Sequence, residues 1–124
     1  MDVVLWIVAG VLALAFLAAG AMKLAQPKEK LAASGMGWVD DFSAGAVKAI
    51  GLAEVLGAVG LVLPGLTGVA PVLVPLAALG LALTMVGAAV VHLRRGEQQM
   101  VGVNAVLLVL ALVVVVGRFW VEPF

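Results

Sequence analysis

The sequence predicts an all-α polytopic membrane protein, built as a bundle of four transmembrane helices. Of its 124 residues, 65% are hydrophobic and 11% are charged, and the mean hydropathy is +1.29. A soluble fold of this length has too little interior to bury so much apolar surface. The chain also contains several apolar runs of about 20 residues, the length that crosses a hydrocarbon core about 30 Å thick.

The apolar runs do not alternate with polar residues, which predicts helices rather than barrel strands. We expect one domain over residues 1–124, with spans near 3–24, 46–63, 69–91 and 100–117 and a connection over 25–45 at the cytoplasmic interface. The first run predicts a span rather than a signal peptide, since Asp2 replaces the usual basic start and the run is longer than an h-region.

Proline and glycine mark the boundary between the second and third spans. Pro64, Gly65 and Gly68 predict a tight turn. Pro71 suits the first turn of the third helix, where a missing N–H needs no partner, and Pro75 predicts a kink farther along.

The spans differ in composition. The second is rich in Gly and Ala, so we expect neighbouring backbones to approach it closely and place it at the centre of the bundle. The fourth is bulky and almost uniformly aliphatic, as is typical of a helix that faces lipid.

The connection over 25–45 is too long for a simple turn. Trp38 and Phe42 are four residues apart, as on one face of a short helix that lies along the membrane surface as a lid. Gly35 and Gly37 favour an irregular loop instead, and both alternatives stay open.

Basic residues predict the orientation. The two connections that join spans one to two and three to four, with their helix ends, carry Lys23, Lys28, Lys30, Lys48, Arg94 and Arg95. The other side of the membrane has Arg118 and the terminal amine. The positive-inside bias therefore predicts both connections in the cytoplasm and both termini outside.

Glu54 lies in the middle of the second span. At 1.5 Å per residue it is about 12 Å below the cytoplasmic boundary, where an ionised carboxylate facing lipid costs about 3 kcal/mol. We therefore expect Glu54 to face the bundle interior, to be protonated, or both. Lys23 or His92 is a better partner than Lys48, which lies six residues away and points roughly 120° from Glu54 on the same helix.

Polar residues from all four spans fall at the cytoplasmic end and predict a pocket there. The candidate ligand-binding or proton-linked residues are Glu54, His92, Lys23, Lys48, Asn104 and Arg94, and Gln98, Gln99 and Thr84 extend the network. Structural alternatives are an interhelical ion pair for Glu54, interfacial anchors for the lysines, arginines and His92, and an interhelical hydrogen bond for Asn104.

The composition also excludes several classes of function. The chain has no cysteine and one histidine, so it offers no dithiol, thiolate metal site or Fe–S cluster, and no pair of axial haem histidines. We predict no metal site. The formal net charge is zero, with no concentrated basic face that would favour a nucleic-acid partner. The sequence contains no nucleophile or acid–base pair at a spacing that would predict a stand-alone enzyme.

Three stretches and one further residue resemble the DoxX-like family of small four-helix bacterial membrane proteins: "FLAAGAMKL", "KAIGLAEVLGAVGLVLPGL", "GAAVVHLRRGE" and the Arg118 that ends span four. The resemblance implies a four-helix fold in a bacterial plasma membrane, with Lys23, Glu54, His92 and Arg94 at recurring polar positions. It also implies an association with quinol oxidation or other redox enzymes for some relatives, and a role in receptor assembly for animal relatives.

Three functions follow as hypotheses. The first is a redox-associated accessory subunit that binds a quinone, or another apolar ligand such as a lipid, inside the bundle. The second is a non-catalytic assembly factor that packs on another membrane protein through the Gly-rich face of span two. The third is a proton-coupled transporter acting as a homo-oligomer, suggested by the similar ends of spans one and three, "GAMKLAQPKEK" and "GAAVVHLRRGEQ".

Overall fold

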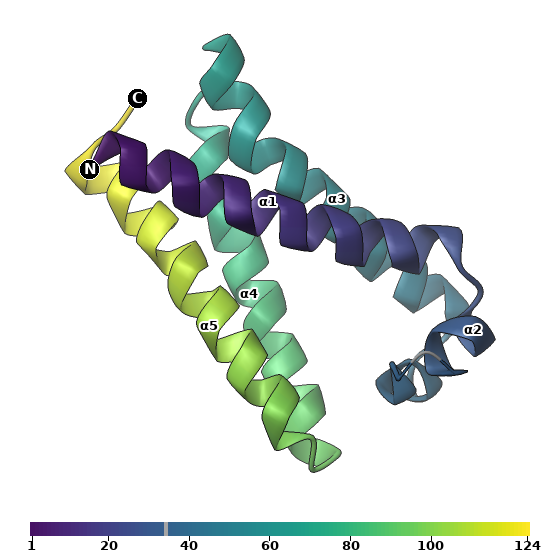
Figure 1. The fold of residues 1–124 in the computed structure, drawn as a ribbon. Helices are drawn as coiled ribbons and strands as arrows, with labels where there is room; N and C mark the ends of the chain where they lie inside the picture. Colours follow the sequence, from purple (N-terminus) through teal and green to yellow (C-terminus); the bar gives the residue numbers. More distant parts are fainter. Residues whose placement is uncertain (34) are drawn as a thin grey trace.

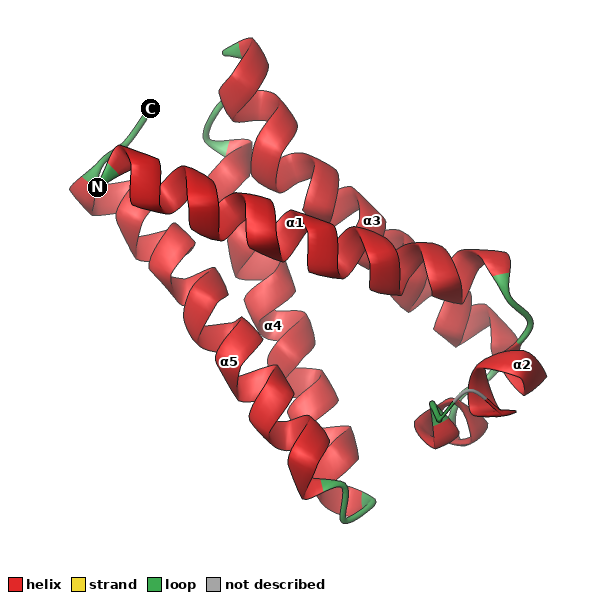
Figure 2. Ribbon diagram, viewed as in Figure 1, coloured by secondary structure: helices red, strands yellow, loops and turns green. Residues whose placement is uncertain are grey.

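The computed structural model describes residues 1–33 and 35–124, and this part of the chain is helical without a strand (Figure 2). The elements are α1 (Asp2–Ala25), α2 (Lys28–Ala33), the 3₁₀-helix η1 (Gly37–Asp41), α3 (Ala44–Thr67), α4 (Leu73–Arg94), α5 (Gln98–Val116) and the π-helical turn η2 (Gly117–Val121). Four helices are long and apolar enough to cross a membrane. The predicted all-α polytopic fold is confirmed.

The four long helices form a ring in which α1 packs on α3, α3 on α4, α4 on α5 and α5 on α1. Figure 1 shows two pairs, α1 with α3 and α4 with α5, that diverge as they run away from the chain termini. The prediction that span two occupies the centre of the bundle is wrong. A ring of four has no central member, and each helix buries one stripe while its outer face carries exposed Leu and Val.

The turn between α3 and α4 lies later in the chain than its Pro and Gly residues predict. Helix α3 continues through Pro64 and Gly65 to Thr67, although Pro64 has no N–H to donate to the carbonyl of Gly60. Gly68 ends the helix in the left-handed conformation, with φ 72°, and its N–H donates to the carbonyl of Pro64.

The two prolines at the start of α4 also differ from expectation. Pro71 lies in the turn before the helix, and Pro75 lies in the first helical turn. The N–H groups of the first turn have no partner within the helix, so Pro75 removes no hydrogen bond there. The predicted kink at Pro75 is therefore wrong.

Small residues bring α1 and α3 into backbone contact. A Cβ atom on Gly20 would lie 2.6 Å from the carbonyl oxygen of Gly51, and one on Gly51 would lie 2.9 Å from the carbonyl oxygen of Gly20. Only glycine at both positions permits this crossing. Gly57 and Gly60 of α3 make room for the side chains of Leu81 and Ala77 of α4. The predicted close approach to span two is confirmed.

The end of the bundle that carries the termini is closed by a buried arginine. The Arg118 guanidinium donates to the Asp2 carboxylate over 2.7 Å and to the carbonyl of Glu122 over 3.0 Å. It also lies 3.9 Å from the ring centroid of Phe124, which makes an edge contact with Trp6. The start of α1 and the end of the chain are thereby fastened together.

The connection between α1 and α3 folds as two short helices, α2 and η1, around a small core of Leu31, Val39 and Val47. Trp38 and Phe42 come from η1 and the residue after it, and their rings meet edge to face at 5.7 Å. The connection is thus neither one amphipathic helix nor an irregular loop. It lies beside the ends of α1 and α3 where the two helix pairs are farthest apart (Figure 1).

Candidate functional site

A cavity of about 570 Å³ lies between the diverging helix pairs and the α1–α3 connection. All four long helices line it, and most of its wall is apolar. Phe16, Trp38 and Phe42 supply aromatic surface, while its ionisable and amide side chains are Lys23, Glu54, His92 and Asn104. An apolar cavity with a few convergent polar groups is the usual form of a small-molecule site.

Lys23 and Glu54 form a buried ion pair on one wall of this cavity. The Nζ of Lys23 donates to Oε1 of Glu54 over 2.6 Å, and the two side chains are 8% and 4% exposed. Each residue lies three positions after a glycine of the α1–α3 crossing, so the contact of Gly20 with Gly51 brings the pair together. Of the two partners expected for Glu54, the structure selects Lys23, and Lys23 is not the interfacial anchor of the alternative interpretation.

Lys48 has a different position from the other candidate residues. Its ammonium donates to the backbone carbonyls of Lys23, Leu24 and Gln26 over 2.8 to 2.9 Å. These are carbonyls at the end of α1 that have no partner inside the helix, and a cation there also complements the helix dipole. Lys48 therefore caps α1 from α3 and does not contact Glu54, as its position on the helix predicts.

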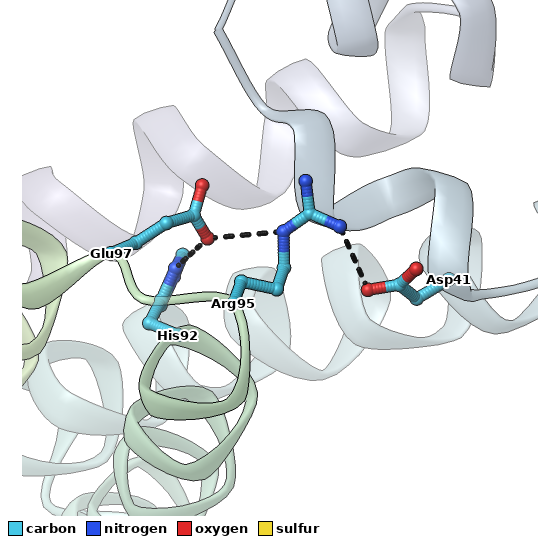
Figure 3. A network of polar contacts seen from close by, with 4 residues as sticks. All are labelled: Asp41, His92, Arg95 and Glu97. Atoms are coloured by element: carbon cyan, nitrogen blue, oxygen red, sulfur yellow. Dashed lines mark hydrogen bonds and ion pairs between the residues drawn. The ribbon is translucent and has the colours of Figure 1, made fainter.

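His92 belongs to a polar network that joins the α4–α5 turn to the connection (Figure 3). Oε1 of Glu97 lies 2.9 Å from Nδ1 of His92 and accepts from Nε of Arg95 over 3.2 Å. Nη1 of the same Arg95 donates to the Asp41 carboxylate over 2.9 Å. Gly37 permits this approach, since a Cβ there would lie 2.9 Å from Nη2 of Arg95.

Asn104 projects from α5 into the cavity wall and is 5% exposed. Its Nδ2 is buried and has no hydrogen-bond partner among residues 1–33 and 35–124. A buried donor without a partner costs about 1–3 kcal/mol. The amide N–H₂ of Asn104 therefore does not make the expected interhelical hydrogen bond within the described residues, while span four does contribute Asn104 to the polar group, as predicted.

Most of the remaining candidates lie apart from the cavity. Arg94, Gln98 and Gln99 are exposed and do not line the cavity. Thr84 does line it, but its hydroxyl donates to the carbonyl of Gly80 within α4. The structure thus gathers Lys23, Glu54, His92 and Asn104 around one volume and leaves Lys48 and Arg94 outside it.

Asp41, Arg95 and Glu97 were not among the sequence candidates for the site. For Glu97 the signal in the sequence is the preceding glycine, Gly96. Its positive φ of 73° turns the chain back after α4 and brings Glu97 near His92. Asp41 carries no such signal, since it is 54 residues from Arg95. Within the described residues, no group of three or more His, Asp or Glu side chains is arranged to hold a metal ion.

The charged side chains around the cavity contact one another. Glu54 neutralises Lys23, while Asp41 and Glu97 contact Arg95. The cavity is therefore lined by aromatic surface, one closed ion pair, an imidazole and the Asn104 side chain. Such a wall can bind a neutral, largely apolar molecule and can orient its polar end by hydrogen bonds.

Comparison with known proteins agrees with this architecture. No curated protein and no solved structure matches the chain. The model of the DoxX-like family matches residues 7–114, which include the four cavity residues Lys23, Glu54, His92 and Asn104. This match covers most of the sequence, and the chain therefore belongs to the DoxX-like family.

Proposed function

We propose that this protein binds a quinone-like molecule in the cavity between its two helix pairs and serves as an accessory subunit of a membrane redox system. The observation that carries the proposal is an apolar, aromatic cavity of about 570 Å³ whose wall also gathers four polar side chains, Lys23, Glu54, His92 and Asn104. Sites for small ligands commonly have volumes of about 300–1,000 Å³. The cavity thus has room for a substituted ring, with any long tail left in the lipid.

The residues of the wall fit such a molecule. Trp38 and Phe42 offer ring surfaces for packing, and Asn104 adds an amide side chain to the same wall. His92 is held through Nδ1 by Glu97, which leaves Nε2 as its second hydrogen-bonding group. A bound quinone would supply reversible electron and proton transfer, and the side chains of this chain would bind and orient it.

The same proposal includes an orientation in a bacterial plasma membrane. Lys23, Lys48 and Arg95 lie at the cavity end of the bundle, whereas Arg118 lies at the end that carries the termini. The bias of basic residues toward the cytoplasm supports a cavity near the cytoplasmic leaflet and termini outside.

The test is mass spectrometry of the quinones and lipids that co-purify with the protein in mild detergent. We expect the wild-type protein to retain a quinone-class molecule and Glu54→Gln to lose it, because that change leaves the Lys23 ammonium uncompensated in the cavity wall. Glu29→Gln changes an exposed carboxylate outside the cavity and is the matched control. Bulk phospholipid alone in all three preparations would overturn the proposal.

The two other hypotheses have less support. Gly51, Gly57 and Gly60 pack on α1 and α4 of the same chain, so the face that would contact a client membrane protein is used within the bundle. A proton-coupled transporter stays a prediction that needs a homo-oligomer. Proton flux into liposomes under a pH gradient would test it.

A further inference from the structure

The imidazole of His92 is bonded on one edge only. Its Nδ1 lies 2.9 Å from Oε1 of Glu97, and its Nε2 has no hydrogen-bond or ion-pair partner within the described residues. The buried side-chain nitrogen and oxygen atoms without a partner in this part of the chain are Oε1 of Gln26 and Nδ2 of Asn104. Nε2 of His92 is not among them, so this nitrogen is accessible although the whole residue is only 6% exposed.

The unbonded edge of the imidazole faces the cavity. His92 lines the cavity, whereas Glu97 does not. The two nitrogens of an imidazole point to nearly opposite sides of the ring, so the edge with Nδ1 turns out of the cavity toward Glu97 and the edge with Nε2 turns into it. The nearby side chains are engaged or hidden, since Lys23 and Glu54 bind each other at 2.6 Å and Nδ2 of Asn104 is inaccessible. Nε2 is therefore a hydrogen-bonding atom that the wall offers to a ligand.

The contact with Glu97 decides whether Nε2 accepts or donates. The Glu97 carboxylate also accepts from Nε of Arg95 over 3.2 Å (Figure 3), and an ionised carboxylate can only accept hydrogen bonds. The proton of a neutral imidazole therefore lies on Nδ1, which leaves the lone pair of Nε2 as an acceptor. Arg95 is held in turn by Asp41 over 2.9 Å, so the network orients the ring from outside the cavity.

An acceptor in an apolar wall favours a ligand with a neutral donor. A hydrocarbon or a carbonyl compound would leave Nε2 without a partner. An ammonium group would donate to it, but the carboxylate that lines the cavity, Glu54, is already paired with Lys23, so desolvation of the cation would not be offset. A hydroxyl group supplies the donor without a charge. The ligand is therefore an apolar molecule that carries a hydroxyl.

We propose that His92 is the ligand-recognising residue of the cavity. Its Nε2 accepts a hydrogen bond from the hydroxyl of an apolar ligand, and Glu97 is the positioning residue that keeps the proton on Nδ1. This rests on the proposed function, because it requires that the cavity hold an apolar molecule. Within the quinone class, His92 selects the reduced form, which carries ring hydroxyls, over the oxidised form, which carries carbonyls. A diacylglycerol shares the hydroxyl chemistry, and the test separates the two sources.

The experiment is calorimetric titration of the purified full-length protein in lauryldimethylamine oxide, a detergent without a hydroxyl, at about pH 8, where imidazoles are ordinarily neutral. The probes are trimethylphenol, its analogue isodurene with methyl in place of the hydroxyl, trimethylbenzoquinone and dioctanoylglycerol. We expect the wild-type protein to bind trimethylphenol about tenfold more tightly than isodurene or the benzoquinone, the difference made by one buried hydrogen bond. His92→Phe keeps a ring and removes Nε2, so it should abolish this preference and keep the affinity for isodurene.

Gln98→Phe is the matched control, since it introduces the same ring in place of an exposed polar side chain outside the cavity. It should keep the wild-type preference for trimethylphenol.

A second readout needs no variant at His92. The chain has one histidine, so labelling of histidine with nitrogen-15 gives the spectrum of a single imidazole. Without ligand, Nδ1 should carry the proton and Nε2 should be bare. Trimethylphenol should shift the Nε2 resonance, and isodurene should not. Glu97→Leu should populate both tautomers, because the carboxylate that holds the proton on Nδ1 is gone. A proton on Nε2 of the unliganded wild-type protein would overturn the proposal.

The titrations also distinguish failure of this proposal from failure of the proposed function. Equal affinities for trimethylphenol and isodurene, unchanged in His92→Phe, would overturn the role of His92 and leave a binding cavity. Tighter binding of the benzoquinone than of trimethylphenol would do the same. No saturable binding of any of the four probes would overturn the proposed function as well. Binding of dioctanoylglycerol that depends on His92 and is tighter than that of trimethylphenol would support hydroxyl recognition and overturn a quinone-like ligand.

Discussion

Lys23 of α1 and Glu54 of α3 form a 2.6 Å ion pair inside the membrane-spanning part of the bundle. Removal of one partner leaves the other charge buried and uncompensated, which costs about 3–5 kcal/mol in folded proteins. We expect Lys23→Met and Glu54→Gln each to lower the free energy of unfolding by about 3 kcal/mol. The double variant should lose clearly less than the sum. Reversible unfolding in mixed SDS and dodecylmaltoside micelles measures the wild-type protein, the two single variants and the double variant. If the losses of unfolding free energy add strictly, the two residues do not interact.

The contact of Gly20 with Gly51 sets the distance between α1 and α3. Gly51→Ala would place a Cβ 2.8 Å from that of Lys23 and 2.9 Å from the carbonyl of Gly20. We expect a loss of about 1–3 kcal/mol, because the helices must separate. Gly10→Ala is the control in α1, since nothing lies within 4 Å of its added Cβ. Equal effects of the two changes on unfolding in mixed micelles would contradict the close crossing.

Arg95 fastens the α1–α3 connection to the α4–α5 turn through Asp41. The hydrogen bond with Asp41 raises the pKa of Arg95 above its already high ordinary value, so the guanidinium stays charged wherever the protein is folded. We expect Arg95→Gln to speed amide hydrogen exchange severalfold across residues 37–41. Raising the salt concentration to about 0.5 M should have part of the same effect, because exposed ion pairs are screened.

The neighbouring Arg94 supplies the control for this measurement. It is exposed and does not line the cavity, so Arg94→Gln should leave exchange in residues 37–41 unchanged. If both variants exchange at the wild-type rate, the Asp41–Arg95 contact does not hold the connection in place.

Arg118 closes the opposite end of the bundle. Its side chain is 2% exposed, whereas that of Asp2 is 53% exposed, so loss of the pair should cost less than loss of a fully buried one. We expect Arg118→Gln to destabilise the protein by about 2 kcal/mol. Arg118→Lys should recover only part of this, because an ammonium lacks the planar face that lies over Phe124. Unfolding in mixed micelles measures both, and full recovery with lysine would show that charge alone matters.

The absence of cysteine makes the proposed orientation directly testable. Glu29→Cys lies in the α1–α3 connection and Glu122→Cys near the C-terminus, and both positions are exposed. On intact cells, a membrane-impermeant maleimide should label the cysteine at 122 and should label the one at 29 only after permeabilisation. The reverse pattern would place the cavity at the outer leaflet.

Hydropathy in the sequence was sufficient to predict the four-helix membrane fold, and the depth of Glu54 was sufficient to predict a buried partner for it. The predicted helix ends differ from the observed ones where proline was taken as a helix breaker. Pro64 lies inside α3, and Pro75 lies in the first turn of α4. A proline removes a helical hydrogen bond only where a full turn of helix precedes it, so its effect depends on where the helix begins. Gly68 ends helix α3, four residues after Pro64.

Polar residues of the cavity were predicted as a group, but not by their contacts. Lys23 and Lys48 have the same chemistry, and yet Lys23 pairs with Glu54 while Lys48 caps the end of α1. The rotation of α1 against α3 makes this difference, and that rotation depends on the glycine contact between the helices. The same reason applies to Asn104, whose unpaired amide is visible only once its neighbours are in place.

The sequence by itself determined which solvent surrounds this protein and how many times the chain crosses it, because hydropathy is a property of each segment taken alone. Only the tertiary structure decided that two helix pairs diverge around a cavity and that Asp41 meets Arg95 across 54 residues. Helix crossings and side-chain contacts arise from packing between segments distant in sequence, and no local pattern encodes them.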